Sequence, residues 1–372
     1  MGTLRAAFYL LSLVVLAAGC SSANPYYDAS RTHHTAEGFV NNYAAKVTKS
    51  RADLLRWLYE SKRDGLPKPA ALATPTQSPD LALIQAYGSA QPGTSPGAAI
   101  TWIGHASMLV QAGRLNVLTD PVFSERASPL SFLGPKRAQA PGLALKDLPP
   151  IDVVLISHNH YDHLDKQSVT DLAARPASEG RAPTLFLVPL GLKPWFLDLG
   201  INNVIEMDWW DQHVVRGVSF HFTPVQHWSA RGLGDRSQTL WGGYAVFAPD
   251  FHWYFSGDTG YSKDFADTRE RFKAPYPGGF DLALIAVGAY EPRWFMKDQH
   301  VNPAESVQVH KDLGARRSVG VHWGTFSLTD ESLDQPPREL ALARQAQGLN
   351  EEDFFLMKIG ETRQLPARPA SP

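Results

Sequence analysis

Residues 151–165, IDVVLISHNHYDHLD, constrain this chain more than any other stretch. The stretch opens with apolar residues rich in β-branched side chains, which predict a short buried strand. His158, His160, Asp162 and His163 follow directly. Imidazoles and carboxylates are the ligands that Zn²⁺ and related cations prefer, and a solvated loop seldom gathers four of them so closely. The stretch therefore predicts about half of a two-metal site.

Three further polar residues lie at or just after the ends of later apolar segments: His227, Asp258 and His322. Each alone is more often a turn or core residue than a ligand, but together they complete a ligand set for two ions. We expect the carboxylate of Asp258 to bridge the two sites, and two Zn²⁺ ions per chain as the cofactor. One site would consist of His158, His160 and His227, and the other of Asp162, His163 and His322.

Segments of strand character alternate with helical segments over most of the chain. Strands are expected near residues 98–123 (as one hairpin), 151–157, 184–189, 204–210, 218–225, 240–258, 281–290 and 317–324. Helices are expected at 192–199, 264–272, 303–313 and 338–347. The helix at 303–313 follows an N-cap asparagine and begins with a proline, with a capping-box glutamate two residues on. Two β-rich layers with helices outside fit an α/β four-layer sandwich better than a Rossmann-type sheet.

Two polar residues mark the ends of the predicted hairpin. His105 and Asp120 could each support a metal ligand or simply form part of a turn. For His105 we favour the structural role, and for Asp120 both interpretations remain.

The N-terminus has the features of a secretory leader. Arg5 precedes an apolar run over residues 6–18, which is too short to span a bilayer as a mature helix. The sequence LAAGC resembles the lipobox of bacterial lipoproteins, in which Cys20 would be lipidated, although Ala17 replaces the usual leucine. An ordinary leader with a chance cysteine is the alternative. We expect a lipid anchor at Cys20 and, because Ser21 follows it, attachment to the outer membrane of the bacterial cell envelope.

The amino-acid composition limits the classes of partner that the protein can bind. The chain has 35 Lys and Arg against 37 Asp and Glu, and it has no clustered basic stripe, so nucleic-acid binding is not expected. Cys20 is the single cysteine, which excludes an intrachain disulfide. The expected organisation is a leader (1–20), a linker and covering segment (21–97), a domain that carries the predicted metal site (98–366) and a tail (367–372). In the linker, the adjacent His33 and His34 are expected to be solvated and receive no role.

The order HxHxDH, followed by a separate His, Asp and His, resembles the metallo-β-lactamase superfamily, whose fold is a four-layer αββα sandwich with a dinuclear site at one edge. Further motifs between about residues 100 and 361 are similar to the N-acylphosphatidylethanolamine-hydrolysing phospholipase D family. They include TWIGHAS, LTDPVFSERASP, GPKR, FTPVQHW, FSGDTGY, GAYEPRWFMKDQHVNPAE and VHWGTF. This resemblance implies a zinc-dependent phosphodiesterase that produces phosphatidic acid and an N-acylethanolamine from a phospholipid at a membrane surface.

The resemblance also suggests catalytic roles. Asp162 would handle a proton in addition to binding metal. His300, in the DQHVNP segment, would hold the phosphate or protonate the leaving oxygen, and a structural role for it is equally open.

Two alternative functions remain at this point. A lactonase or another ester hydrolase could use the same scaffold. β-Lactam hydrolysis is disfavoured because dinuclear β-lactamases usually place a cysteine in the second site, and the cysteine of this chain is in the leader. A non-catalytic metal-binding envelope lipoprotein is the other alternative, although a purely structural zinc normally has four protein ligands. The oligomeric state is left open.

Overall fold

The computed structural model describes residues 24–44, 49–89, 97–175, 182–232 and 234–368. The predicted leader with Cys20, and the last residues of the predicted tail, lie outside these ranges. Within them, no helix is both long and apolar enough to cross a membrane.

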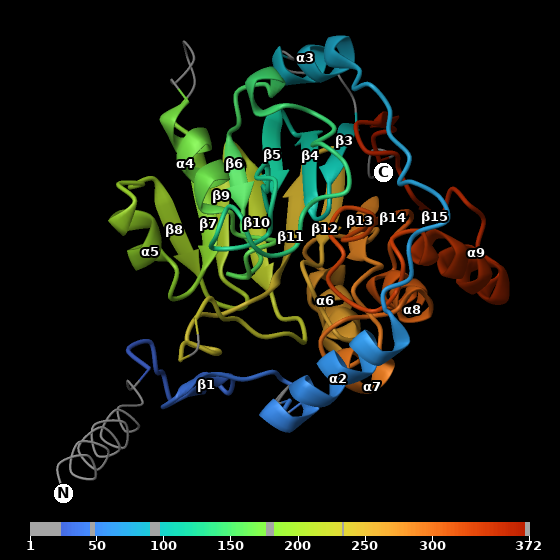
Figure 1. The fold of residues 1–372 in the computed structure, drawn as a ribbon. Coiled ribbons are helices and arrows are strands. Elements are labelled where there is room, and N and C mark those ends of the chain that lie inside the picture. Colours follow the sequence, from blue (N-terminus) through green and yellow to red (C-terminus); the bar gives the residue numbers. More distant parts are fainter. Residues whose placement is uncertain (1–23, 45–48, 90–96, 176–181, 233, 369–372) are drawn as a thin grey trace, which may run out of the picture.

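Two seven-stranded mixed sheets pack face to face, with helices on both outer sides (Figure 1). In spatial order the first sheet consists of β16 (Thr362–Leu365), β3 (Ala98–Gly104), β4 (Ser107–Ala112), β5 (Leu115–Thr119), β6 (Val153–Leu155), β7 (Leu185–Pro189) and β8 (Val204–Met207). The second consists of β15 (Phe354–Phe355), β14 (Ser318–Val321), β13 (Leu282–Ala286), β12 (Phe251–Phe255), β11 (Gly243–Ala248), β10 (Val218–Thr223) and β9 (Gln212–Val215). The predicted four-layer αββα sandwich is confirmed.

The helices form the outer layers. On the side of the first sheet lie α3 (Leu81–Ser89), α4 (Lys166–Ala174) and α5 (Lys193–Asp198), and on the side of the second lie α6 (Asp264–Lys273), α8 (Pro303–Leu313) and α9 (Gln335–Gln347). Helix α8 has the bounds that its capping box predicts, because Asn302 and Glu305 each bond the other's backbone N–H. Helix α9 begins three residues before the predicted start, since Pro336 and Pro337 occupy its first turn, where no N–H is needed.

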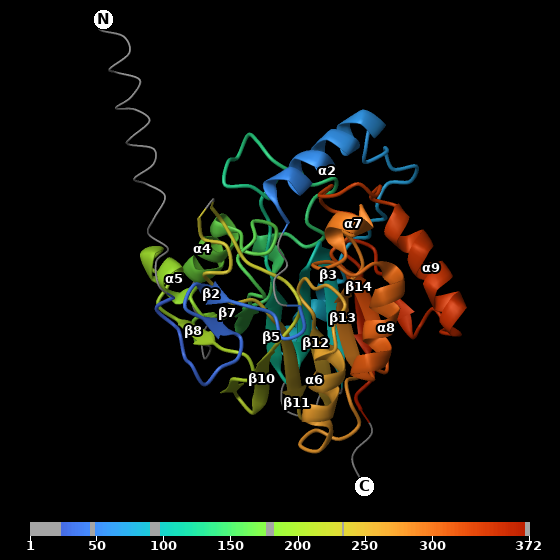
Figure 2. The same ribbon diagram turned by 90° about the horizontal axis from the view of Figure 1, so that it is seen from below.

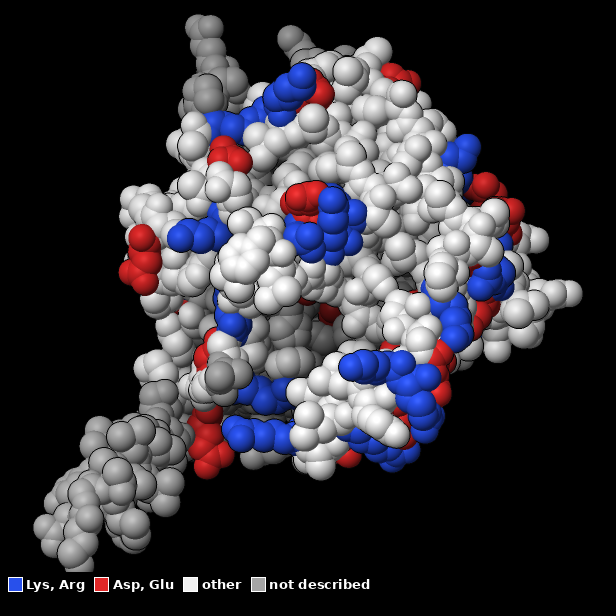
Figure 3. Space-filling view, viewed as in Figure 1, with Lys and Arg blue, Asp and Glu red and all other residues white. Residues whose placement is uncertain are grey.

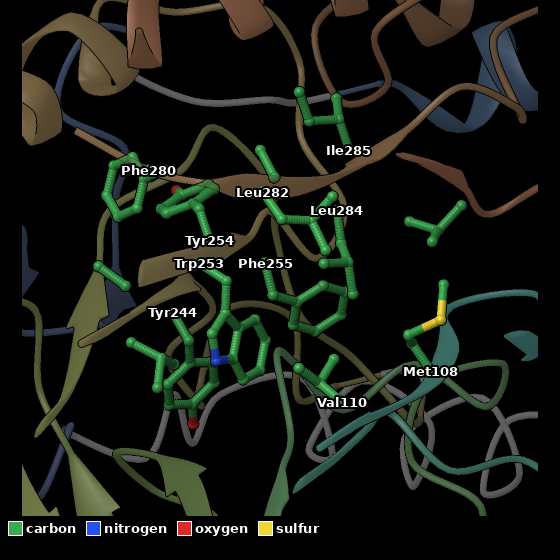
Figure 4. Packing of buried hydrophobic residues seen from close by; sticks show 14 of the residues in the cluster. Met108, Val110, Tyr244, Trp253, Tyr254, Phe255, Phe280, Leu282, Leu284 and Ile285 are labelled. Atoms are coloured by element: carbon green, nitrogen blue, oxygen red, sulfur yellow. The ribbon is translucent and has the colours of Figure 1, made fainter. Parts of the chain in front are cut away.

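The main core lies between the sheets. Met108 and Val110 of β4 belong to the same buried cluster as Trp253 and Phe255 of β12 (Figure 4). A central strand such as β13 is buried at every position because it is covered on both faces, which explains why it is continuously apolar rather than alternating.

The C-terminal ends of the strands that precede the predicted ligands meet at one edge of the sandwich. Strands β5, β6 and β7 are parallel, as are β12, β13 and β14, and β10 runs in the same direction as β12 because both pair antiparallel with β11. The segments after β6, β10, β12 and β14 therefore carry their polar residues to this edge (Figure 1).

Two expectations about local structure are wrong. The single hairpin predicted for residues 98–123 is three strands, because a second reversal at His105 and Ala106 separates β3 from β4. His105 has a positive φ of 55°, which is uncommon for a residue other than glycine, so neither its residue type nor the apolar pattern indicated this turn. The segment 208–210, expected to continue β8, is a turn.

The N-terminal segment is more ordered than a linker. Residues 24–44 carry the short hairpin of β1 (His34–Thr35) and β2 (Gly38–Phe39), and α2 (Arg51–Asp64) follows; together they cross the edge where the strands end (Figure 2). The expectation that His33 and His34 are solvated is wrong. Both are buried, with Nε2 atoms 2.7 and 3.0 Å from the two carboxylate oxygens of Asp208. Their partner lies some 175 residues away in sequence, so a local reading cannot find it.

Candidate metal centre

The three histidines of the first predicted site converge. The Nε2 atom of His158 is 2.8 Å from Nδ1 of His160, and Nε2 of His227 is 3.4 Å from the same atom. These nitrogens belong to segments after β6 and β10, so the packing of the two sheets brings them together. Three imidazole nitrogens facing one point form a suitable half-site for a cation of the Zn²⁺ type.

The second predicted site forms around the carboxylate of Asp162. Its Oδ2 atom is 3.4 Å from Nε2 of His163 and 3.3 Å from Nε2 of His322. Nε2 of His105 is nearer still, at 3.0 Å. The structure thus places His105 among the donors of this site, whereas the sequence favoured a structural role for it. The HxHxDH spacing gives no sign of His105, because this residue lies in the turn between β3 and β4, far from that motif in the sequence.

Asp258 lies between the two groups. Its Oδ2 atom is 3.1 Å from Nε2 of His163 and 3.9 Å from Nε2 of His227, and its Oδ1 atom is 3.2 Å from Nε2 of His322. This is the position that a bridging carboxylate requires, and the bridge itself remains a prediction. His300 lies at the same point, with Nδ1 3.8 Å from Asp258 Oδ2.

Hydrogen bonds to the far side of the rings orient the ligand atoms. Nδ1 of His163 lies 2.7 Å from Asp120 Oδ2, and the Ser157 hydroxyl, which donates to Asp120, lies 2.9 Å from Nδ1 of His158. Nδ1 of His227 donates to the carbonyl oxygen of Gln299 at 2.9 Å. Metal-binding histidines usually make such bonds, which leave Nε2 available for the metal. Asp120, whose role the sequence left open, therefore supports two of the predicted ligands.

The carboxylates of the centre favour the binding of cations. Burial raises the pKa values of Asp162 and Asp258, but the surrounding imidazoles, His163 first among them, together outweigh this effect and hold both pKa values well below the usual range. Burial disfavours protonation of His322, yet Asp258 and Asp162 outweigh it and raise its pKa to about 9. The buried Asp258 and the half-buried Asp162 thus demand compensating positive charge. His163 Nε2 and Asp258 Oδ1 have no hydrogen-bond partner among the described residues, so the donor set fits a dinuclear metal site.

A groove of about 490 Å³ leads to this centre. Its floor includes His160, Asp162, Asp258 and His300, and its walls include Lys49, Ser50, Arg51, Leu54, Trp57, Trp228, Arg236, Phe295, Met296 and Leu328. Figure 3 shows the surface hollowed on this face, with Lys and Arg side chains beside the hollow. Part of the wall therefore comes from α2, in the segment that the sequence assigned to covering the domain. Trp57, whose ring lies 4.9 Å from that of Phe295, had no sequence signal that pointed to the groove.

Comparisons with known proteins agree with this geometry. A sequence profile described as "Beta-lactamase superfamily domain" matches residues 115–323, more than half of the chain. The chain is 41% identical over 274 residues to N-acyl-phosphatidylethanolamine-hydrolyzing phospholipase D 1 of Caenorhabditis elegans, covering 70% of this chain and 74% of that protein. It is 35% identical over 271 residues to the mitochondrial enzyme of the same name from Saccharomyces cerevisiae, covering 70% and 55%. An isothiocyanate hydrolase from Delia radicum gut bacteria shares the fold, with a TM-score of 0.56 at 21% identity over 73% of this chain and 100% of that one.

The paired sheets and the His/Asp centre at their edge define the class: the chain belongs to the metallo-β-lactamase superfamily and is a metal-dependent hydrolase. Within that class, its identity to the nematode and yeast proteins places it in the N-acylphosphatidylethanolamine-hydrolysing phospholipase D family. The resemblances to the superfamily and to the phospholipase D family are confirmed, and the non-catalytic alternative is set aside.

Proposed function

We propose that the protein is a zinc-dependent phosphodiesterase that hydrolyses N-acylphosphatidylethanolamine, or a related phospholipid, to phosphatidic acid and an N-acylethanolamine. The observation that carries the proposal is a groove that joins the His/Asp centre to an apolar wall. The names of the nematode and yeast relatives support the choice of substrate.

The groove has two chemically different parts. Leu54, Trp57 and Phe295 give one part an apolar surface, which suits an acyl chain. Arg236 lies in the lining with the metal centre, and its charge suits an anionic phosphodiester, while the nearby Lys49 is paired with Asp298 at 2.9 Å. A phospholipid with an N-acylated head group matches both parts, whereas a small lactone would leave the apolar wall uncovered.

The predicted ligands would hold the ions as three imidazoles on one side and Asp162, His163 and His322 on the other, with Asp258 between them. When bound, Zn²⁺ neutralises phosphate oxygens and lowers the pKa of a water molecule to about 7, which makes a nucleophile available at neutral pH.

We assign roles toward the substrate to two side chains on the floor of the groove. The Asp162 carboxylate stays ionised at neutral pH, so it can accept a proton from the attacking water. Burial lowers the pKa of His300 to about 3, so its ring is neutral and suits an N–H donor to a phosphoryl oxygen better than a charged acid. We assign His300 to holding the phosphate.

The test is hydrolysis of N-acylphosphatidylethanolamine in vesicles by the purified full-length protein in ¹⁸O-labelled water, with a lactone and nitrocefin as competing substrates. Attack on phosphorus with departure of the ethanolamide oxygen places the label in phosphatidic acid. Release of diacylglycerol, label in the N-acylethanolamine, or turnover of the lactone alone would contradict the proposal.

Asp258→Asn is the control for the metal centre. The substitution removes one negative charge that both predicted sites share, so elemental analysis should show lost metal together with a loss of activity of more than about 100-fold. Unchanged metal content would contradict the bridging role.

A further inference from the structure

The side chain of Asn41 is paired with the backbone of His227, which lies 186 residues later in the chain. Asn41 Nδ2 donates to the carbonyl oxygen of His227 at 3.0 Å, and the His227 N–H donates to Asn41 Oδ1 at 3.0 Å. The indole N–H of Trp241 is shared between Asn41 Oδ1, at 3.1 Å, and the carbonyl oxygen of Val225, at 3.0 Å. Asn41 is buried, so its removal would leave polar groups without partners.

His227 depends on this pairing because its segment lacks regular structure. Strand β10 ends at Thr223, and His227 follows in a segment that is neither helix nor strand. The preceding Gln226 forms an isolated β-bridge with Gly260, but both backbone polar groups of His227 itself bond to Asn41. The carbonyl of Gln299 fixes the ring through Nδ1. Backbone and ring are thus held separately, with Nε2 directed toward His160.

Asn41 is itself held in place by the segment around it. His33 and His34 bind the two oxygens of Asp208, and the N–H of Phe39 donates to the carbonyl of Ser237 at 2.8 Å. The Phe39 side chain is buried in the main core. These contacts lie on both sides of the chain reversal between β1 and β2, so residues 24–41 are attached to the sandwich at several points.

The contacts of His33 and His34 with Asp208 are connected to Asn41 through buried tryptophans. The His33 ring stacks on Trp209, with centroids 4.3 Å apart and an interplanar angle of 26°. The indole N–H of Trp209 donates to the Trp241 carbonyl at 2.6 Å, and Trp241 in turn donates to Asn41. Contiguous buried contacts thus join the His/Asp208 cluster to the backbone of a predicted metal ligand.

We propose that Asn41 is a positioning residue for His227, and that residues 24–43 thereby form part of the metal centre. This proposal rests on the metal-binding role proposed for His227 and does not depend on the identity of the substrate. A fixed backbone reduces the ordering that the ring must undergo when metal binds. Residues that orient a ligand from behind are typically worth 10–100-fold in metal affinity.

The experiment compares Asn41→Ala with Asn42→Ala in the full-length protein. Asn42 is the same residue type one position later, and its side chain donates to Asp264 Oδ1 at 2.8 Å rather than to a predicted ligand. Titration against a competing chelator measures the affinity for each of two Zn²⁺ ions. We expect Asn41→Ala to bind one ion roughly 10–100-fold more weakly and the other within about threefold of wild type. Asn42→Ala should bind both ions as wild type does.

Two results would overturn the proposal. One is wild-type affinity for both ions in Asn41→Ala. The other is an equal loss of affinity for both ions in Asn41→Ala and Asn42→Ala. If Asn41→Ala does not fold, Asn41→Asp decides. The carboxylate of Asn41→Asp still accepts from the His227 N–H and from Trp241, but it faces the His227 carbonyl oxygen. Binding of the same single ion should therefore be weakened, and unchanged affinity would again overturn the proposal. Neither titration uses lipid turnover, so a wrong substrate assignment would leave the result intact.

Discussion

Burial alone does not decide what a histidine does in this protein. His322 and His221 are both buried, but their surroundings differ in charge. His322 faces two carboxylates, which raise its pKa to about 9 against the effect of burial. His221 packs against Phe272 and lies near the positive charge of Arg271, so burial and this charge lower its pKa to about 4. The first environment favours a positive charge, and the second favours a neutral aromatic ring.

His221 should therefore make the fold sensitive to acid. Its pKa is lower in the folded protein than in the unfolded chain, so its stabilising effect is present above about pH 6.5 and is lost as the pH falls through about 4. We expect His221→Phe to remove on the order of 2 kcal/mol of the pH dependence of the unfolding free energy over this interval. Denaturant unfolding of both proteins at several pH values measures the difference, since other buried histidines are common to both. Parallel pH curves would show that His221 does not contribute.

At the scale of elements, the turns after the strands determine how closely the ligands approach. Gly257, directly before Asp258, has a φ of 55°, and a Cβ there would lie 2.6 Å from Ser157 Cβ. Ser157 belongs to the network that links Asp120 to His158. The turn after β12 is thus packed against Ser157, which supports the predicted ligands after β6. Both the positive φ and the lack of space for a Cβ require glycine at position 257.

Gly257→Ala should destabilise the protein and weaken metal binding together. Gly348, at the end of α9, has a similar φ of 67° with no heavy atom within 4 Å of an added Cβ, so it is a matched control. The left-handed backbone costs about 1 kcal/mol in each variant, and overpacking against Ser157 adds about 1–3 kcal/mol at Gly257 alone. Unfolding free energies and metal content measure the difference. Equal losses in the two variants would mean that Ser157 moves aside without cost.

At the scale of the whole molecule, the hydrolase sandwich and the N-terminal segment form one functional unit. Ser50, Leu54 and Trp57 line the groove, and Asn41 supports His227. Residues 24–44 and 49–64 therefore complete a site whose predicted ligands all lie beyond residue 150. We propose that a lipid at Cys20 attaches this unit to the bacterial cell envelope at the outer membrane, where a phospholipid substrate is present.

The anchor predicts how the protein fractionates. Wild-type protein expressed in a bacterium that processes lipoproteins should sediment with membranes, because the lipid at Cys20 inserts into the bilayer. Cys20→Ala should be soluble or remain uncleaved. Membrane fractions analysed by mass spectrometry measure both size and lipidation. A processed Cys20→Ala protein that sediments like wild type would show that lipid is not the means of attachment.

The sequence by itself determined the local features of this protein. Apolar runs and their endings predicted most strands, and the capping box at Asn302 gave both ends of α8. The HxHxDH spacing and the later polar residues predicted the seven side chains that the structure brings together at one edge. The elements and the convergence of these side chains are predictable because a strand or a capped helix depends on neighbours in sequence, and because parallel strands carry their ends to the same edge. Metal binding by the seven side chains stays a prediction.

Tertiary structure decided which distant residues support that centre. His105 reaches Asp162 across the first sheet, whereas Asn41 bonds His227 and His33 meets Asp208 only when the N-terminal segment docks on the sandwich. Each pair is separated by 57 residues or more, and the residues at these positions carry no periodic or spacing signal. A polar side chain that is buried must find a partner, but its own sequence neighbourhood does not specify which one. The packing of the sandwich makes that choice.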